Sequence, residues 1–175
     1  WRGLMLNRGV QHFLQDVVWG DDLDYLLIDM PPGTGDVQMG VAKLVPRAEV
    51  VVVTTPALAA QKVAIRAVSM ARKSFLRVAG VIENMSAFTD NHGEVHALFG
   101  SGGGQTLADD AGVPLLGQVP IEPLVSAGGD AGEPVDQSRA ERGGRTARLP
   151  VACIDALQQA EGEQQRDRLQ EVEHH

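Results

Sequence analysis

The chain has 175 residues, of which 43% are hydrophobic, which is enough to bury one ordinary core and is typical of a single domain. Its net charge is −8 and it contains no dense basic tract, which argues against nucleic-acid binding. The one cysteine, Cys153, excludes an intrachain disulfide framework and favours a cytoplasmic protein, and every apolar run is shorter than the roughly 20 residues of a membrane span.

Apolar periodicity predicts helices that alternate with strands. The valines at 50–53 are typical of a strand buried on both faces. The helix expected at 62–73 would turn Val63, Ala67 and Met70 inward. In chain order the prediction is helix 7–19, strand 25–28, helix 37–44, strand 50–53, helix 62–73, strand 78–82, helix 105–111, strand 115–119 and helix 151–159. This order predicts an α/β fold with a mainly parallel sheet flanked by helices.

Unusual residues follow each predicted strand. They are an acid with two prolines at 29–32, a Thr-Thr-Pro string at 54–56, Glu-Asn at 83–84 and a proline at 120. Ligands of such sheets bind beyond the carboxyl ends of the strands. We therefore expect a binding site along that edge.

The string "DYLLIDMPPGTGDV" at 24–37 places one carboxylate, Asp29, after a run of apolar residues. A carboxylate in this position is typical of nucleotide hydrolases, where it lies beside Mg²⁺ and the phosphates. The turn Gly33-Thr34-Gly35 lets backbone N–H groups approach a terminal phosphate. The alternative is that Asp29 caps the next helix with a proline turn behind it.

The same string resembles the signature of the Mrp/ApbC family of P-loop ATPases, thought to act as iron–sulfur cluster carriers. The resemblance continues, in order and to about Val135, through "WRGLM" at 1–5, "VVVTTP" at 51–56, "GVIENMS" at 80–86, "FGSGGGQTLA" at 99–108, "GVPLLGQVPIEP" at 112–123 and "GGDAGEPV" at 128–135. It implies a P-loop NTPase fold of the deviant Walker A group, to which MinD and ParA belong.

The resemblance also implies roles for single residues. Asp29 would hold the water shell of Mg²⁺, and Asn84 would read the adenine edge of ATP, unless it is a turn-capping residue. The segment around Asp36 is matched, but no role is assigned to that acid. The remaining implied residues are the γ-phosphate switch, Pro32, Gly33 and Gly35, and the base and ribose side of the pocket, Pro120 and Glu122.

The phosphate loop of the family has no counterpart in these residues, because no Gly-Lys-Ser/Thr string occurs. We therefore expect residues 1–160 to be the C-terminal portion of one ATPase domain, inactive alone, and residues 161–175 to be a polar tail with a tag-like end. The string "GSGGGQTL" at 100–107 is read as a flexible joint, with an anion site at the helix start as the alternative.

The cysteine pair of the family is also missing. Many members carry Cys-x-x-Cys soon after the Asn-Met-Ser string, and two subunits each donate that pair to a bridging cluster. Here Asp90, Asn91, His92 and Gly93 occupy the place, so no iron–sulfur ligands are identified, although Asp90 and His92 are candidate replacements. His92 with His96 is a second, weaker metal candidate, and surface histidines are the plainer interpretation.

The leading hypothesis is a homodimeric Mrp-type protein that binds and hydrolyses ATP with Mg²⁺ and serves iron–sulfur cluster assembly or delivery to client proteins. One alternative is a nucleotide-gated dimerisation switch of the ParA/MinD type that carries no metal, which the missing cysteine pair favours. Another is a non-catalytic scaffold. Neither nucleic acid nor a membrane is expected as a partner.

Overall fold

The computed structural model describes residues 2–20, 23–30 and 36–132. The described residues form two compact units, one drawn from 2–50 with 66–78 and the other from 51–65 with 79–132. None of the helices in these ranges is long and apolar enough to cross a membrane. The helix expected at 151–159 lies outside the described residues.

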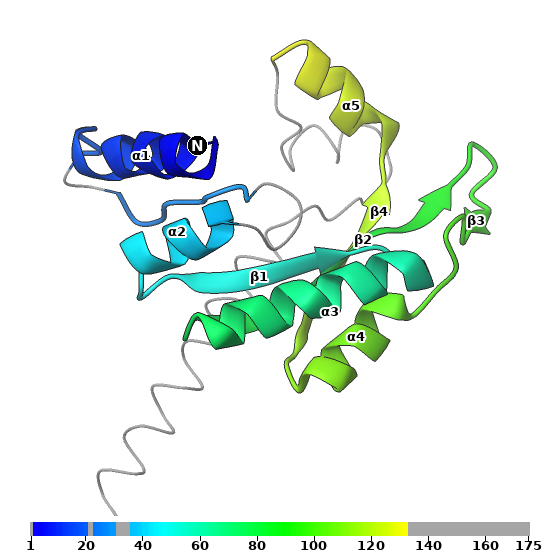
Figure 1. Ribbon diagram of the computed structural model, residues 1–175. Helices are drawn as coiled ribbons and strands as arrows, with labels where there is room; N and C mark the ends of the chain where they lie inside the picture. Colours follow the sequence, from blue (N-terminus) through cyan, green and yellow to red (C-terminus); the bar gives the residue numbers. More distant parts are fainter. Residues whose placement is uncertain (1, 21–22, 31–35, 133–175) are drawn as a thin grey trace, which may run out of the picture. The chain divides into compact units, whose positions relative to one another are not determined.

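Two helices, α1 (Arg2–Gln15) and α2 (Asp36–Leu44), contact each other in the first unit (Figure 1). A Cβ added to Gly40 would collide with the side chain of Asn7, so glycine permits the close approach of the helices. Both helices confirm the expectation from periodicity. However, α1 ends before residues 17–19, and Val17 and Val18 are exposed.

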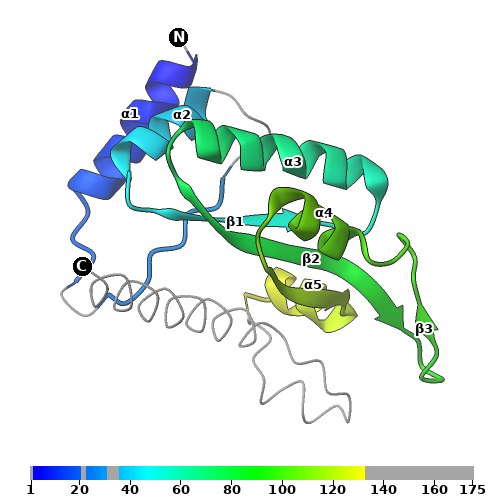
Figure 2. The same ribbon diagram turned by 90° about the horizontal axis from the view of Figure 1, so that it is seen from below.

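Four strands form the sheet of the described residues: β1 (Glu49–Thr54), β2 (Arg77–Thr89), β3 (Val95–His96) and β4 (Leu115–Ile121). The long strand β2 is central and pairs with the other three (Figures 1 and 2). It runs parallel to β4 and antiparallel to β3. The strands expected at 50–53, 78–82 and 115–119 are therefore confirmed, each longer than predicted, whereas β3 was not predicted.

Helix α4 (Gly103–Ala111) packs on β4 in the second unit, and Figures 1 and 2 both show it beside the strands. Its buried residues recur at helical spacing and are Gly103, Gly104, Leu107, Ala108 and Ala111. A short helix, α5 (Pro123–Asp130), follows β4 and was not predicted.

The buried face of helix α3 (Leu58–Lys73) is shifted by one position along the sequence from the predicted face. Ala64, Val68 and Ala71 are buried, whereas Val63, expected to point inward, is 58% exposed. Both sets keep the helical spacing, so periodicity alone does not separate them. Val68 and Val63 are the same residue type, so residue size does not decide which of the two is buried.

The strand expected at 25–28 is wrong. Residues 23–30 belong to none of the strands of the described sheet, and Leu27 is 88% exposed. An apolar run becomes a strand only when a neighbouring strand supplies partners for its N–H and C=O groups. Within the described residues, no strand does so here.

A substitution at Gly80 tests how closely β2 packs beside the start of β4. The N–H of Val81 donates to the carbonyl oxygen of Pro114 at 2.9 Å, and a Cβ on Gly80 would lie 2.6 Å from that same oxygen. We expect Gly80→Ala to lower the free energy of unfolding by about 1–3 kcal/mol, the usual range for overpacking, as measured by urea denaturation. Gly117→Ala is the matched control on β4, because a Cβ there meets nothing within 4 Å. Equal effects of the two substitutions would contradict the prediction.

Candidate functional site

A buried carboxylate, Glu83, holds together the region where the sequence places its binding edge. The residue is only 1% exposed. Its Oε2 accepts the backbone N–H of Gly104, at the start of α4, at 2.5 Å, and its Oε1 accepts the side-chain amide of Gln118 on β4 at 2.7 Å. Glu83 therefore ties β2 to a helix and to a second strand. No role was expected for Glu83 from the sequence, although an acid that directly follows the apolar run at 78–82 is a usable signal.

The glycine-rich segment is packed rather than a flexible joint. Gly102 caps α4 with φ 74°, a left-handed conformation that favours glycine. A Cβ on Gly103 would meet the carbonyl oxygen of Pro56, and one on Gly104 would meet the side chain of Glu83. The carboxylate of Glu83 already supplies the negative charge that a helix N-terminus attracts. The Glu83 carboxylate thus occupies the N-terminus of α4, which the sequence had offered as an alternative site for an external anion.

Asn84 and Pro120 are brought together by the register of β2 and β4. Asn84 pairs with Val119, and the next pair along the strands is Phe88 with Ile121. Between these pairs β2 has residues 85–87 where β4 has only Pro120, a residue that lacks an N–H for the ladder. The expectation that Glu83 and Asn84 end their strand is therefore wrong, since β2 bulges there and continues to Thr89.

The amide of Asn84 also shapes this bulge. Its Oδ1 accepts the N–H of Met85 at 2.9 Å, and Met85 has φ 55°, which is unusual for a residue with a side chain. This contact is the turn-capping alternative considered for Asn84. A carbonyl oxygen has two lone pairs, so the contact is compatible with a further donor.

Glu122 has a structural contact of its own. It is the N-cap of α5, and its Oε1 accepts the N–H of Leu124 at 3.2 Å. Asn84, Pro120 and Glu122 all belong to the second compact unit. Asp29 belongs to the first unit and is exposed, whereas Pro32, Gly33 and Gly35 lie outside the described residues.

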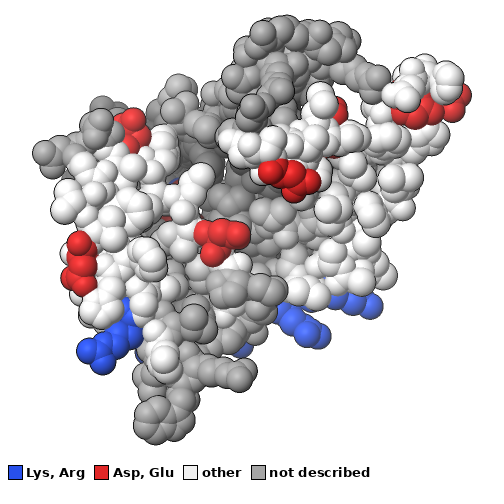
Figure 3. All heavy atoms as spheres, turned by 90° about the horizontal axis from the view of Figure 1, so that it is seen from above, with Lys and Arg blue, Asp and Glu red and all other residues white. Residues whose placement is uncertain are grey.

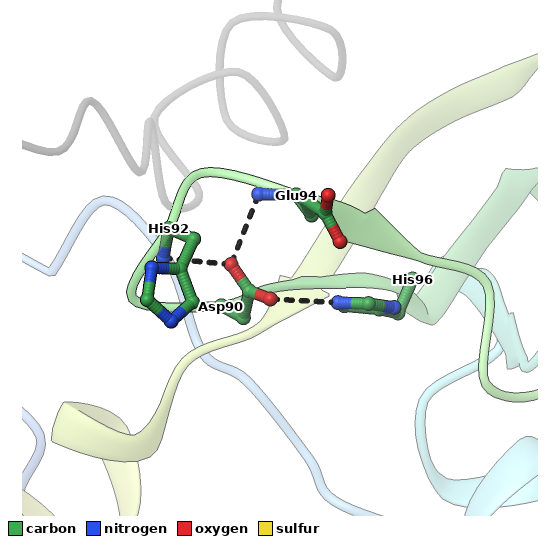
Figure 4. Close-up of polar contacts among 4 residues, drawn as sticks. All are labelled: Asp90, His92, Glu94 and His96. Carbon is green, nitrogen blue, oxygen red and sulfur yellow. Dashed lines mark hydrogen bonds and ion pairs between the residues drawn. The ribbon is translucent and has the colours of Figure 1, made fainter.

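The loop that replaces the cysteine pair is a tight hairpin between β2 and β3 (Figure 4). Oδ1 of Asp90 accepts the N–H groups of His92 at 2.8 Å and Glu94 at 3.0 Å, and its Oδ2 lies 3.0 Å from Nε2 of His96. The hydrogen bond from His96, followed by those from the backbone, holds the pKa of the Asp90 carboxyl below its usual range. The Asp90 carboxylate therefore contacts the His92 backbone and the His96 ring. The replacement of thiolates by Asp90 and His92 stays a prediction.

A family model for ParA, described as NUBPL iron-transfer P-loop NTPase, matches residues 1–152. A protein of Mycobacterium tuberculosis (strain H37Rv) named iron-sulfur cluster carrier protein is 53% identical over 141 residues, which cover 77% of this chain and 37% of that protein. A protein of the same name from Saccharolobus solfataricus is 44% identical over 136 residues, which cover 77% of this chain and 46% of that protein. The chain thus spans less than half the length of these curated relatives.

Two solved structures share the fold. The nucleotide-binding protein of Archaeoglobus fulgidus, in complex with ADP and with Co found, superposes with a TM-score of 0.65 at 35% identity, covering 74% of this chain and 53% of that one. The MinD cell division protein of Aquifex aeolicus superposes with a TM-score of 0.57 at 20% identity, and the match covers 91% of this chain and 61% of that one.

Proposed function

Because the chain belongs to the ParA family of NUBPL iron-transfer P-loop NTPases, we propose that it forms the base-binding and switch portion of an ATPase that serves iron–sulfur cluster assembly. Its fold is the α/β fold of the P-loop NTPases, including MinD. The observation that carries the proposal is the position of Asn84 at the bulge of β2, where it pairs with Val119, the residue before Pro120. The proposal is supported by the ADP bound to the Archaeoglobus fulgidus protein and by relatives that are named iron-sulfur cluster carrier proteins.

In this proposal the half-buried amide of Asn84 reads adenine, since an amide offers one donor and one acceptor to the N6 and N7 edge. Pro120 and Glu122 line the base and ribose side. Asp29 holds the water shell of Mg²⁺. The switch that senses the γ-phosphate is formed by Pro32, Gly33 and Gly35.

Base discrimination tests this assignment. The 175 residues contain no Gly-Lys-Ser/Thr loop, so affinities are measured on a chain extended upstream by a phosphate-binding segment, here called the extended chain. We expect Asn84→Ala to weaken ATP binding by about 1–3 kcal/mol, the usual size of a bidentate base contact, and to leave the poorer GTP binding unchanged. Isothermal titration with both nucleotides measures the difference.

A second substitution separates recognition from the turn. Asn84→Asp keeps the Oδ1 that accepts the N–H of Met85 but removes the amide donor. If Asn84 reads adenine, Asn84→Asp loses ATP affinity while the free energy of unfolding stays close to that of the parent. Retained ATP affinity in Asn84→Asp, or equal losses for ATP and GTP in Asn84→Ala, would make Asn84 a structural residue.

A nucleotide-gated dimerisation switch without a cluster is the second candidate function. It is favoured by the number of cysteines, because a bridging cluster takes two thiolates from each subunit and the sequence offers only Cys153. The extended chain is reconstituted with iron and sulfide under anaerobic conditions, with and without ATP. ATP-dependent dimerisation without a retained cluster supports this candidate, and a stable cluster supports cluster carriage.

A further inference from the structure

The geometry points to a binding site for one divalent transition-metal cation on the β2–β3 hairpin, formed by Asp90, Glu94 and His96, and we propose that Zn²⁺ or a similar first-row cation occupies it. One oxygen of each carboxylate and a ring nitrogen of His96 all lie within 4.8 Å of one another. The proposal needs no nucleotide, so it stands or falls independently of the proposed function.

The β2–β3 hairpin brings the three donor side chains together. Asp90 precedes the turn, Glu94 follows it and His96 lies on β3 opposite Phe88, so residues from both arms meet on one side of the loop. Figure 4 shows the Glu94 carboxylate leaning toward the point where Asp90 and His96 meet. The imidazole of His92 lies on the far side of the Asp90 carboxylate. His92 is therefore not part of the donor set.

Two of the donors are oriented before any metal arrives. Oδ1 of Asp90 is taken by the backbone N–H groups of His92 and Glu94, which directs Oδ2 toward His96. The ring of His96 stacks on Phe88 with a centroid separation of 6.4 Å and an interplanar angle of 28°. Glu94 is exposed and its side chain can rotate to complete the set. A preoriented pair with one adaptable ligand needs little rearrangement to bind.

The charges also favour a cation. Among the described residues, neither carboxylate is paired with a lysine or arginine, and the ion pair of Asp90 is with His96. Figure 3 shows acidic side chains without a described basic neighbour at the projecting right-hand end of the face drawn, where Figure 1 places β2 and β3. An ion bound by both carboxylates relieves their mutual repulsion.

The donor types select the class of ion. One imidazole nitrogen and two carboxylate oxygens form a mixed set that suits Zn²⁺, Co²⁺ or Mn²⁺, whereas Mg²⁺ and Ca²⁺ prefer oxygen alone. A cation about 2.0–2.2 Å from each donor needs donor separations of roughly 3–3.5 Å, so the Oδ2–Nε2 distance of 3.0 Å already fits. Three protein ligands leave at least one position for water or for a donor from another molecule.

Calorimetric titration of the purified chain with ZnCl₂, and visible absorption with CoCl₂, test the site. We expect one site per chain, weakened at least about 10- to 100-fold by His96→Phe, because loss of even an outer-shell partner has that effect. Phenylalanine keeps a ring to stack on Phe88 but removes the nitrogen. Glu94→Gln changes an exposed side chain and should weaken the same site without affecting the fold.

His92→Ala is the matched control, since it removes a histidine of the same loop that is outside the donor set. Any binding by the histidines at 174 and 175 is common to all variants and cancels in the comparison. Absence of Zn²⁺ and Co²⁺ binding in the parent chain would overturn the proposal. So would a loss in His92→Ala equal to that in His96→Phe, or full affinity in both His96→Phe and Glu94→Gln.

Discussion

Replacing Glu83 by alanine is expected to lower the free energy of unfolding by about 3 kcal/mol or more. A hydrogen bond to a charged group contributes about 1.5–3 kcal/mol, and this carboxylate accepts from both Gly104 and Gln118. The substitution also leaves the buried N–H of Gly104 without its acceptor. Urea denaturation followed by circular dichroism measures the loss.

Two further variants locate the effect. Gln118→Ala removes only the exposed partner and should lower the free energy of unfolding by about 1 kcal/mol. Glu83→Gln keeps the shape and one acceptor oxygen, but its NH₂ group faces another donor, so an intermediate loss is expected. If Glu83→Ala is no more destabilising than Gln118→Ala, the carboxylate does not hold α4 to β2.

The strong patterns of the sequence predicted most of the fold. The valines of β1 and the apolar run of β4 form strands because each run suits a buried position in a sheet. Residues 25–28 have the same pattern but lack a partner strand among the described residues, and pairing is not encoded in the run itself. Helix α5 contains two glycines, which lower its propensity, yet Glu122 followed by Pro123 is a recognisable helix start.

Residues of the candidate site could be predicted where they belong to one contiguous sequence motif. Contacts between residues far apart in the sequence could not be predicted. Asn84 and Pro120 could be named from their strings, and the register of β2 and β4 then explains why they are neighbours. The bond from Glu83 to Gly104 joins residues 21 apart and needs both strand and helix in place. The meeting of Asp90 with His96 depends on a hairpin register that the loop composition does not specify.

In the extended chain, Asp29→Asn is expected to reduce Mg²⁺-dependent ATP turnover by about 100-fold or more, because a bound metal supplies several kcal/mol of charge stabilisation in phosphoryl transfer. Asparagine matches the shape of aspartate but removes the charge that would hold the Mg²⁺ water shell. The side chain of Asp29 is exposed, so little change in folding is expected.

The 175-residue chain is the reference for this experiment. Phosphoryl transfer depends on positioning and charge stabilisation, which a phosphate loop chiefly supplies, so this chain should show no turnover with either Asp29 or Asn at that position. Asp36→Asn, at the start of α2, is the control in the extended chain for loss of a nearby carboxylate, and a smaller effect is expected. If Asp36→Asn has the larger effect, the metal-holding acid is Asp36. If the 175-residue chain itself hydrolyses ATP in a way that Asp29→Asn abolishes, its own residues form a phosphate site, and the switch segment would then act without the loop of its relatives.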